Sequence, residues 1–241
     1  MDFADSLMDL TEKMMLLVPL SLLLGGVSQL LKSARSPWAL GIRLRWLAAS
    51  LKLPARHDIS LPDGQQNADG QPNAVGVDHI FALPDRLVVI TMSDLEGRIT
   101  NHDANAPSWE VQQGRGRKLV DNPLRPMERA MLAVNWVTEG GVDRNGRVVT
   151  RAALRFDGTP PPSVMHYPVF KAEMRSLLQT VSQDDQIALG WDKLTEASGP
   201  PLEKPKGPPL SFWIGWTMLA LCAFSTLWLA TDSFVANLPN Q

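Results

Sequence analysis

The chain has 241 residues, 44% of them hydrophobic and 20% charged, which suits one domain of ordinary size with additional segments. Its net charge of −2 excludes a uniformly basic nucleic-acid-binding protein, and its single cysteine excludes a disulfide framework and a cysteine-based zinc site. The four histidines show no metal-ligand spacing, so we expect neither a metal nor a cofactor.

Two uncharged apolar segments lie near the two ends of the chain. A helix over residues 14–31 (MMLLVPLSLLLGGVSQLL) would nearly span the roughly 30 Å hydrocarbon core of a bilayer. Residues 212–231 (FWIGWTMLALCAFSTLWLAT) are also long enough, and tryptophans near both ends are typical of membrane interfaces. The sequence therefore predicts two transmembrane helices, with tails at 1–13 and 232–241. A cleaved signal peptide and an interfacial or core helix remain alternatives for 14–31.

The charges that flank the two segments predict their orientation. Lys32 and several arginines follow the first segment, and Lys204 and Lys206 precede the second. No lysine or arginine follows the second segment. Because positive charge stays on the cytoplasmic side, we expect a bacterial inner-membrane protein with both termini in the periplasm and the central region in the cytoplasm.

The central region alternates between helical and strand patterns. Apolar residues at helical spacing predict a helix over 38–51, and β-rich runs predict a hairpin. The order of elements indicates an α/β domain over 38–182, with a mixed sheet flanked by helices. A proline-rich linker over 198–209 leads to the second apolar segment. The remaining expected elements are a polar loop at 60–73, strands at 75–82, 86–92, 146–156 and 164–170, and helices at 126–139 and 171–181.

Several short motifs follow one another in a specific order. GVDHIFALPDRLVVITMSDLEGRIT is followed by Trp109 and then by DNPLRPMERAML. This succession resembles the nuclease-related domain (NERD) family of the PD-(D/E)xK nuclease-like superfamily, over about residues 38–180. The resemblance implies a nuclease-like sheet and a magnesium site built from carboxylates and a lysine. Such a site needs several oxygen ligands around the metal ion.

The chemical positions of that pattern are mostly replaced in this chain. Asp78 matches the strand aspartate, whereas Thr91 and Ser93 stand where the family has glutamate and lysine. Ile42 replaces a helix glutamate, and Pro126 replaces a glutamine. A lone aspartate holds Mg²⁺ weakly, so we expect a domain without catalytic residues, in which Asp78 is a structural remnant.

Two other interpretations remain open at this stage. The first is a membrane-anchored Mg²⁺-dependent nuclease that uses Asp78 together with Glu96, in the loosely E-x-R segment Glu96-Gly97-Arg98. The second is a DNA-binding platform built on residues 115–155, where nine basic and four acidic residues give a charge of +5. Its candidate nucleic-acid contacts are Arg115, Arg117 and Lys118.

The favoured interpretation is a non-enzymatic interaction or scaffold protein anchored in the inner membrane. We expect its partners to be the membrane and other membrane-complex proteins, as in a DNA-transfer or secretion assembly, and we expect no small-molecule substrate. We also expect Trp109 and Trp136 to be buried against the sheet, since large aromatic side chains in such contexts usually anchor a core.

Overall fold

The computed structural model describes residues 3–34, 36–66, 72–114, 116–180, 184–202 and 207–236, and within them the side chains outside 3–17, 180 and 228–236. The chain forms two compact units, which are described separately below. One is helical and comprises Met1–Ala39 and Gly207–Gln241. The other, Leu40–Lys206, is an α/β unit.

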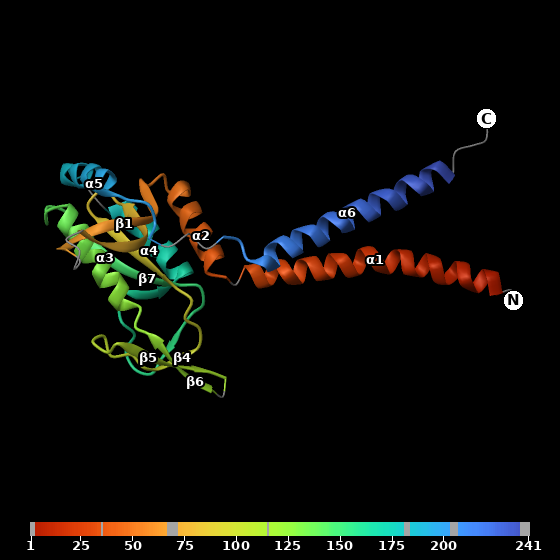
Figure 1. Cartoon of the computed structure of the whole chain (residues 1–241), viewed down its shortest axis with the longest axis horizontal. Helices are drawn as coiled ribbons and strands as arrows, with labels where there is room; N and C mark the ends of the chain where they lie inside the picture. The colour runs from red at the N-terminus through yellow and green to blue at the C-terminus, as the bar shows by residue number, and fades with distance from the viewer. Residues whose placement is uncertain are drawn as a thin grey trace. The chain divides into compact units, whose positions relative to one another are not determined.

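The helical unit pairs the two ends of the chain. Helices α1 (Phe3–Ser33) and α6 (Leu210–Ala236) lie side by side (Figure 1). Their backbones meet at glycines, because a Cβ atom added to Gly26 would lie 3.0 Å from the Gly215 carbonyl oxygen. The Cys222 thiol donates a hydrogen bond to the Pro19 carbonyl oxygen at 3.2 Å. Close approach at small residues is typical of helices that associate in membranes.

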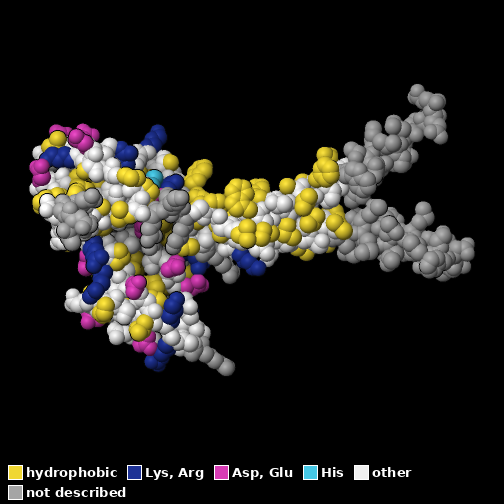
Figure 2. Space-filling model, in the orientation of Figure 1, with side chains coloured by type: hydrophobic (Ala, Val, Ile, Leu, Met, Phe, Trp, Pro, Cys, Tyr) yellow, Lys and Arg dark blue, Asp and Glu magenta, His cyan; other side chains and the backbone are white. Residues whose placement is uncertain are grey.

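Apolar side chains cover the outside of this helical pair (Figure 2). Among the described residues, one segment, Leu210–Leu227, is long and apolar enough to cross a membrane by length and composition. It coincides with most of the expected span at 212–231. The expected span at 14–31 lies inside α1, which begins earlier, at Phe3. The side chains of the expected tails at 1–13 and 232–241 lie outside the described residues.

The α/β unit contains a mixed five-stranded sheet within the described residues, in the order β1-β2-β3-β7-β9. The antiparallel strands are β1 (Ala55–Gln66), β2 (Pro72–Ala82) and β3 (Leu87–Ser93). Strands β7 (Arg144–Thr150) and β9 (Val164–His166) run parallel to β3. This arrangement confirms the expected α/β class with a mixed sheet.

Helices cover both faces of this sheet. On one face, α2 (Pro37–Ser50) and α4 (Tyr167–Thr180) bury a cluster that includes Leu44, Ile90 and Phe170. On the other, α3 (Leu124–Val137) and α5 (Asp185–Ala197) pack against the side of Leu87 and Val89. The compact unit therefore extends past residue 182, because α5 contributes buried side chains to the core.

A second sheet has the order β6-β5-β4-β8. It consists of β4 (Arg98–Asn101), β5 (Ser108–Gln113), β6 (Gly116–Asp121) and β8 (Arg155–Phe156). Trp109 is fully buried in the cluster that joins this sheet to the main one, as expected. Asn122 fixes the adjoining loop, because its side-chain amide donates to the carbonyl oxygens of Ala104 and Ala106 at 2.8 Å.

Some sequence expectations differ from the structure. Residues 60–73 were expected to form a loop, but β1 continues to Gln66 and β2 begins at Pro72. The expected strand at 164–170 ends at His166, where α4 begins. The first residues of the expected linker pair with β1, because Gly199 and Ser60 exchange backbone hydrogen bonds of 2.9 and 3.2 Å.

Trp136 was expected to be buried, and this expectation is wrong, because 59% of its surface is exposed. Helix α3 buries Met127, Ala130 and Val134 against the sheet. Trp136 follows Val134 by two residues, which rotates it by about 200° around the helix axis. The side chain instead lies over Gly64, where an added Cβ atom would come within 2.5 Å of the indole ring.

Candidate functional site

Three of the five positions of the nuclease-like motif, Asp78, Thr91 and Ser93, lie where β2 meets the end of β3. The Asp78 carboxylate accepts a hydrogen bond from the backbone N–H of Met92 at 2.6 Å. The regular pairing of β2 with β3 runs only from His79–Ile90 to Ala82–Leu87. The hydrogen bond from Met92 to Asp78 therefore joins β2 to β3 just beyond their last backbone pair, and it gives the Asp78 carboxylate a structural role.

Thr91 and Ser93 share one face of β3, because alternate residues of a strand point to the same side. They continue the alternation of Leu87 and Val89, which pack on the α3 face. Both are half-buried, and neither supplies a carboxylate or a cation. The Ser93 hydroxyl oxygen accepts a long hydrogen bond of 3.4 Å from the N–H of Leu95.

The two remaining degenerate positions lie on helices. Ile42 is half-buried on α2, which packs on the opposite face of the sheet from Thr91 and Ser93. Pro126 is exposed in the first turn of α3, where its missing N–H has no cost because the first N–H groups of a helix have no intrahelical partner. The structure therefore does not gather all five positions into one cluster.

Next to Asp78, the side chains of β1 and β2 change the face of the sheet to which they point. The register pairs His57 with His79 and Ile59 with Val77, so Asp58 and Asp78 lie between the same two pairs. Ile59 and Val77 pack in the cluster on the α3 face, whereas the rings of His57 and His79 contact Phe81 on the α2 face. Asp58 has a φ of 50°, a left-handed conformation that makes the switch possible, and its carboxylate forms an ion pair with Arg45.

A histidine pair is enclosed beneath α2. The Nδ1 atoms of His57 and His79 lie 2.6 Å apart, and His79 is fully buried. Burial, and then the charges of His57 and Arg45, lower the pKa of His79 to about 3. Within the described part of the chain, Nε2 of His79 has no hydrogen-bond partner, and it faces Gly41. A proton on Nδ1 of His79, donated to His57, leaves Nε2 without a hydrogen and avoids burying an unsatisfied donor.

The parallel strands end in a row of polar residues. Register places Ser93, Thr150 and His166 side by side at the carboxyl ends of β3, β7 and β9. Such carboxyl ends are a common position for ligand sites in sheets of this kind. The Thr150 hydroxyl donates to the Ala152 carbonyl oxygen at 2.8 Å, so its proton already has a partner.

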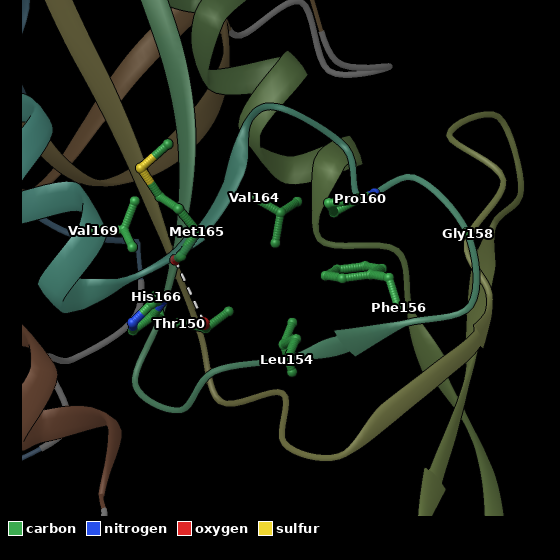
Figure 3. A pocket seen from close by; sticks show the side chains of 9 residues that line it. All are labelled: Thr150, Leu154, Phe156, Gly158, Pro160, Val164, Met165, His166 and Val169. Atoms are coloured by element: carbon green, nitrogen blue, oxygen red, sulfur yellow. Dashed lines mark hydrogen bonds between the residues drawn. The ribbon is translucent and has the colours of Figure 1, made fainter.

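A cavity of about 280 Å³ opens beside this row. Figure 3 shows Leu154, Phe156 and Val164 directed toward one another across it, with Thr150 and His166 at its other side. The walls are mainly apolar, and the described lining carries no carboxylate. Nor do three histidine, cysteine or acidic side chains gather as a metal site anywhere in the described part of the chain. The described walls of this cavity all come from residues 150–169, and none of the sequence motifs indicated it.

The acidic residues of the alternative nuclease site have other partners. The Glu96 carboxylate accepts a hydrogen bond from Arg151 at 2.8 Å, and Arg98 binds Asp157 at 2.6 Å. The E-x-R segment is therefore divided between two separate ion pairs. It does not present an open carboxylate–cation set.

The basic stretch over 115–155 is similarly divided. Arg115 lies outside the described residues. Arg117 and Lys118 are exposed on β6, an edge strand of the second sheet, and Arg117 forms an ion pair with Glu110 at 3.2 Å. Farther along, Arg147 binds Glu173 and Arg151 binds Glu96. Carboxylates thus neutralise part of the +5 charge that the sequence places here.

A second candidate surface surrounds Trp136, in the last turn of α3. A cavity of about 650 Å³ is lined by this tryptophan, Pro62, Val137 and residues of α5. Glu139 and Lys193 form an ion pair of 2.8 Å on its lining. Tryptophan is enriched among the residues that contribute most to protein–protein binding, so this surface suits a protein partner.

Comparison with known protein families, with curated proteins and with solved structures finds no match to this chain.

Proposed function

We propose that this chain is a membrane-anchored interaction protein whose nuclease-like α/β domain lacks a catalytic set. The observation that carries the proposal is the composition of the β2–β3 position. Asp78 there binds the backbone of Met92, and its neighbours are Thr91 and Ser93. Magnesium-dependent cleavage needs more oxygen ligands than this position offers.

Membrane anchoring is supported by both ends of the chain. Leu210–Leu227 has the length and composition of a span, and α1 packs along α6 through glycines. With α1 as a second span, the flanking lysines favour a cytoplasmic α/β unit and periplasmic termini. The partner is then a component of a membrane assembly, such as one for DNA transfer or secretion. The exposed surface around Trp136 is the one we assign to it.

The purified full-length chain should not cleave DNA or RNA in the presence of Mg²⁺ or Mn²⁺. Thr91 and Ser93 supply neither the carboxylate nor the cation that the reaction requires, so metal affinity should be weak. Gel assays of labelled duplex, single-stranded DNA and RNA measure this. A shift of these probes that weakens steeply with salt, without cleavage, would favour the DNA-binding platform instead.

The matched variants are Asp78→Ala and Glu96→Ala. Cleavage that both variants abolish would contradict the proposal and support the nuclease. Cleavage that survives both would be attributed to contamination. The same assay is repeated with the assembly purified from its host, since a partner chain could complete a site.

The two-span topology predicts that the α/β unit and the C-terminus lie on opposite sides of the membrane in intact cells. In a Cys222→Ser background, a cysteine at Leu119, which is 69% exposed on β6, should resist a membrane-impermeant maleimide. An alkaline phosphatase fused after Gln241 should be active, because that enzyme folds only in the periplasm. A second fusion at the same position carries a reporter protein that folds only in the cytoplasm. If the phosphatase fusion is inactive and this second reporter is folded, the topology is contradicted.

A further inference from the structure

The outer face of α2 carries an exposed aromatic ring next to positive charge. Trp46 is 73% exposed, more than any other tryptophan whose side chain is described. Arg43, one turn before it, is also exposed, whereas Leu40, Leu44 and Leu47 face the core. An indole ring on the surface, with an apolar body and a polar N–H, suits the headgroup region of a bilayer.

Helix α4 adds to the same face. The Tyr167 hydroxyl donates a hydrogen bond to the Arg43 carbonyl oxygen at 3.2 Å, which joins the start of α4 to α2. The charges of Arg43 and Arg175 both act on this hydroxyl, and they oppose the burial that raises the Tyr167 pKa. Arg43 and Arg175 are thus two exposed positive charges near one point. Arg45 does not add to them, because Asp58 neutralises it.

The first turn of α2 belongs to the helical unit. Trp38, in the first turn of α2, contacts Phe212 of α6 with ring centroids 4.9 Å apart. Phe212 belongs to the apolar segment Leu210–Leu227. Because α2 is one continuous helix, Trp46 lies about 12 Å from Trp38 along its axis.

We propose that Arg43, Trp46 and Arg175 form a docking surface for anionic phospholipid headgroups. This inference rests on the membrane anchoring proposed above. The arginines bind the phosphates, and the indole ring of Trp46 inserts at the headgroup level beside them. Docking would fix the orientation of the α/β unit to the bilayer and leave the Trp136 surface on α3 for a protein partner.

The test measures how deeply a spin label next to Trp46 enters the bilayer. Ala49 is exposed one turn after Trp46, so the label is attached at Ala49→Cys in full-length Cys222→Ser protein. The protein is reconstituted in vesicles of phosphatidylglycerol and phosphatidylcholine, or of phosphatidylcholine alone. Accessibility to oxygen and to a water-soluble nickel complex reports depth. We expect headgroup depth in the anionic vesicles and a water-like position in the others.

Two reference labels and two sets of variants complete the design. A label at Leu119→Cys marks water, and one at Phe224→Cys on α6 marks the bilayer interior. Trp46→Ala, or Arg43→Glu with Arg175→Glu, should shift the Ala49 label toward water without moving the two reference labels.

Each contrary outcome has a distinct meaning. An Ala49 label as water-accessible as Leu119 in anionic vesicles, with Phe224 in the bilayer, overturns the docking surface alone. Equal depth in both kinds of vesicle overturns the role of anionic lipid. A water-exposed Phe224 label overturns the membrane anchoring itself.

Discussion

Replacing Trp109 with alanine should lower the free energy of unfolding by about 3–5 kcal/mol, enough to unfold a marginal domain. Trp109 is fully buried and lies in the cluster that joins the second sheet to the main one. Its indole N–H donates to the Asp103 carbonyl oxygen at 3.1 Å, so truncation removes both packing and a hydrogen bond. Pulse proteolysis of the full-length protein in urea and mild detergent measures the change.

Trp136→Ala is the matched control, because it removes the same side chain from an exposed position. Its cost should be well below that of Trp109→Ala, since most of the ring remains in water in the folded state. Equal costs for the two variants would contradict the assignment of Trp109 to the core. A stable Trp136→Ala protein is also a suitable reagent for testing whether the partner requires this surface.

The free energy of unfolding should be nearly constant just above about pH 6.5 and should fall as the pH drops below that value. Burial lowers the pKa of His79 to about 3, while the unfolded chain has an ordinary histidine. Between these values the unfolded state binds a proton that the folded state excludes, so acid favours unfolding. At about pH 5 the loss from His79 alone is about 2 kcal/mol.

The pH series compares His79→Leu with His166→Gln by the same proteolysis. The first variant removes the buried titrating group, so its stability should change much less between about pH 5 and about pH 7. The remaining slope belongs chiefly to His57, whose pKa is also lowered by burial. His166→Gln, which changes a half-buried histidine away from the pair, is the matched control. An unchanged slope in His79→Leu would refute the buried pair as its source.

The sequence predicted those elements whose apolar residues repeat regularly. Leu40, Leu44 and Leu47 have helical spacing, and α2 occupies almost the expected range. The hairpin over 75–92 was also predicted, and β2 and β3 pair antiparallel there. Helix α5 was missed because one of its buried positions is Gly190, which a count of apolar residues overlooks.

The β1 strand was missed for a different reason. The alternation of its side chains between the two faces of the sheet is interrupted at Asp58, where the backbone adopts a positive φ. The buried residues before and after Asp58 therefore do not follow a single pattern of every second residue. The turn-like composition of 60–66 added to the error. Strands can tolerate such residues when a neighbouring strand and a helix cover them, and Gly64 lies under Trp136.

The site was predictable only in its chemistry. The sequence alone shows that the position keeps one carboxylate, at Asp78. It also shows that Thr91 and Ser93 stand where the motif has glutamate and lysine. The partner of the Asp78 carboxylate lies on the neighbouring strand, and the cavity beside Thr150 depends on how residues 150–169 fold around it. No local pattern contains that information.

The bridge between Ser60 and Gly199 has a mechanical consequence. Besides the two backbone hydrogen bonds, the Ser60 hydroxyl donates to the Pro200 carbonyl oxygen at 2.7 Å. Tension that arrives along the linker from α6 is therefore borne first by β1, and only after these bonds break does it reach α5. Movement of the anchor would load the edge of the main sheet, and the surface around Trp136 would feel that load because Pro62 and Gly64 of β1 form part of it.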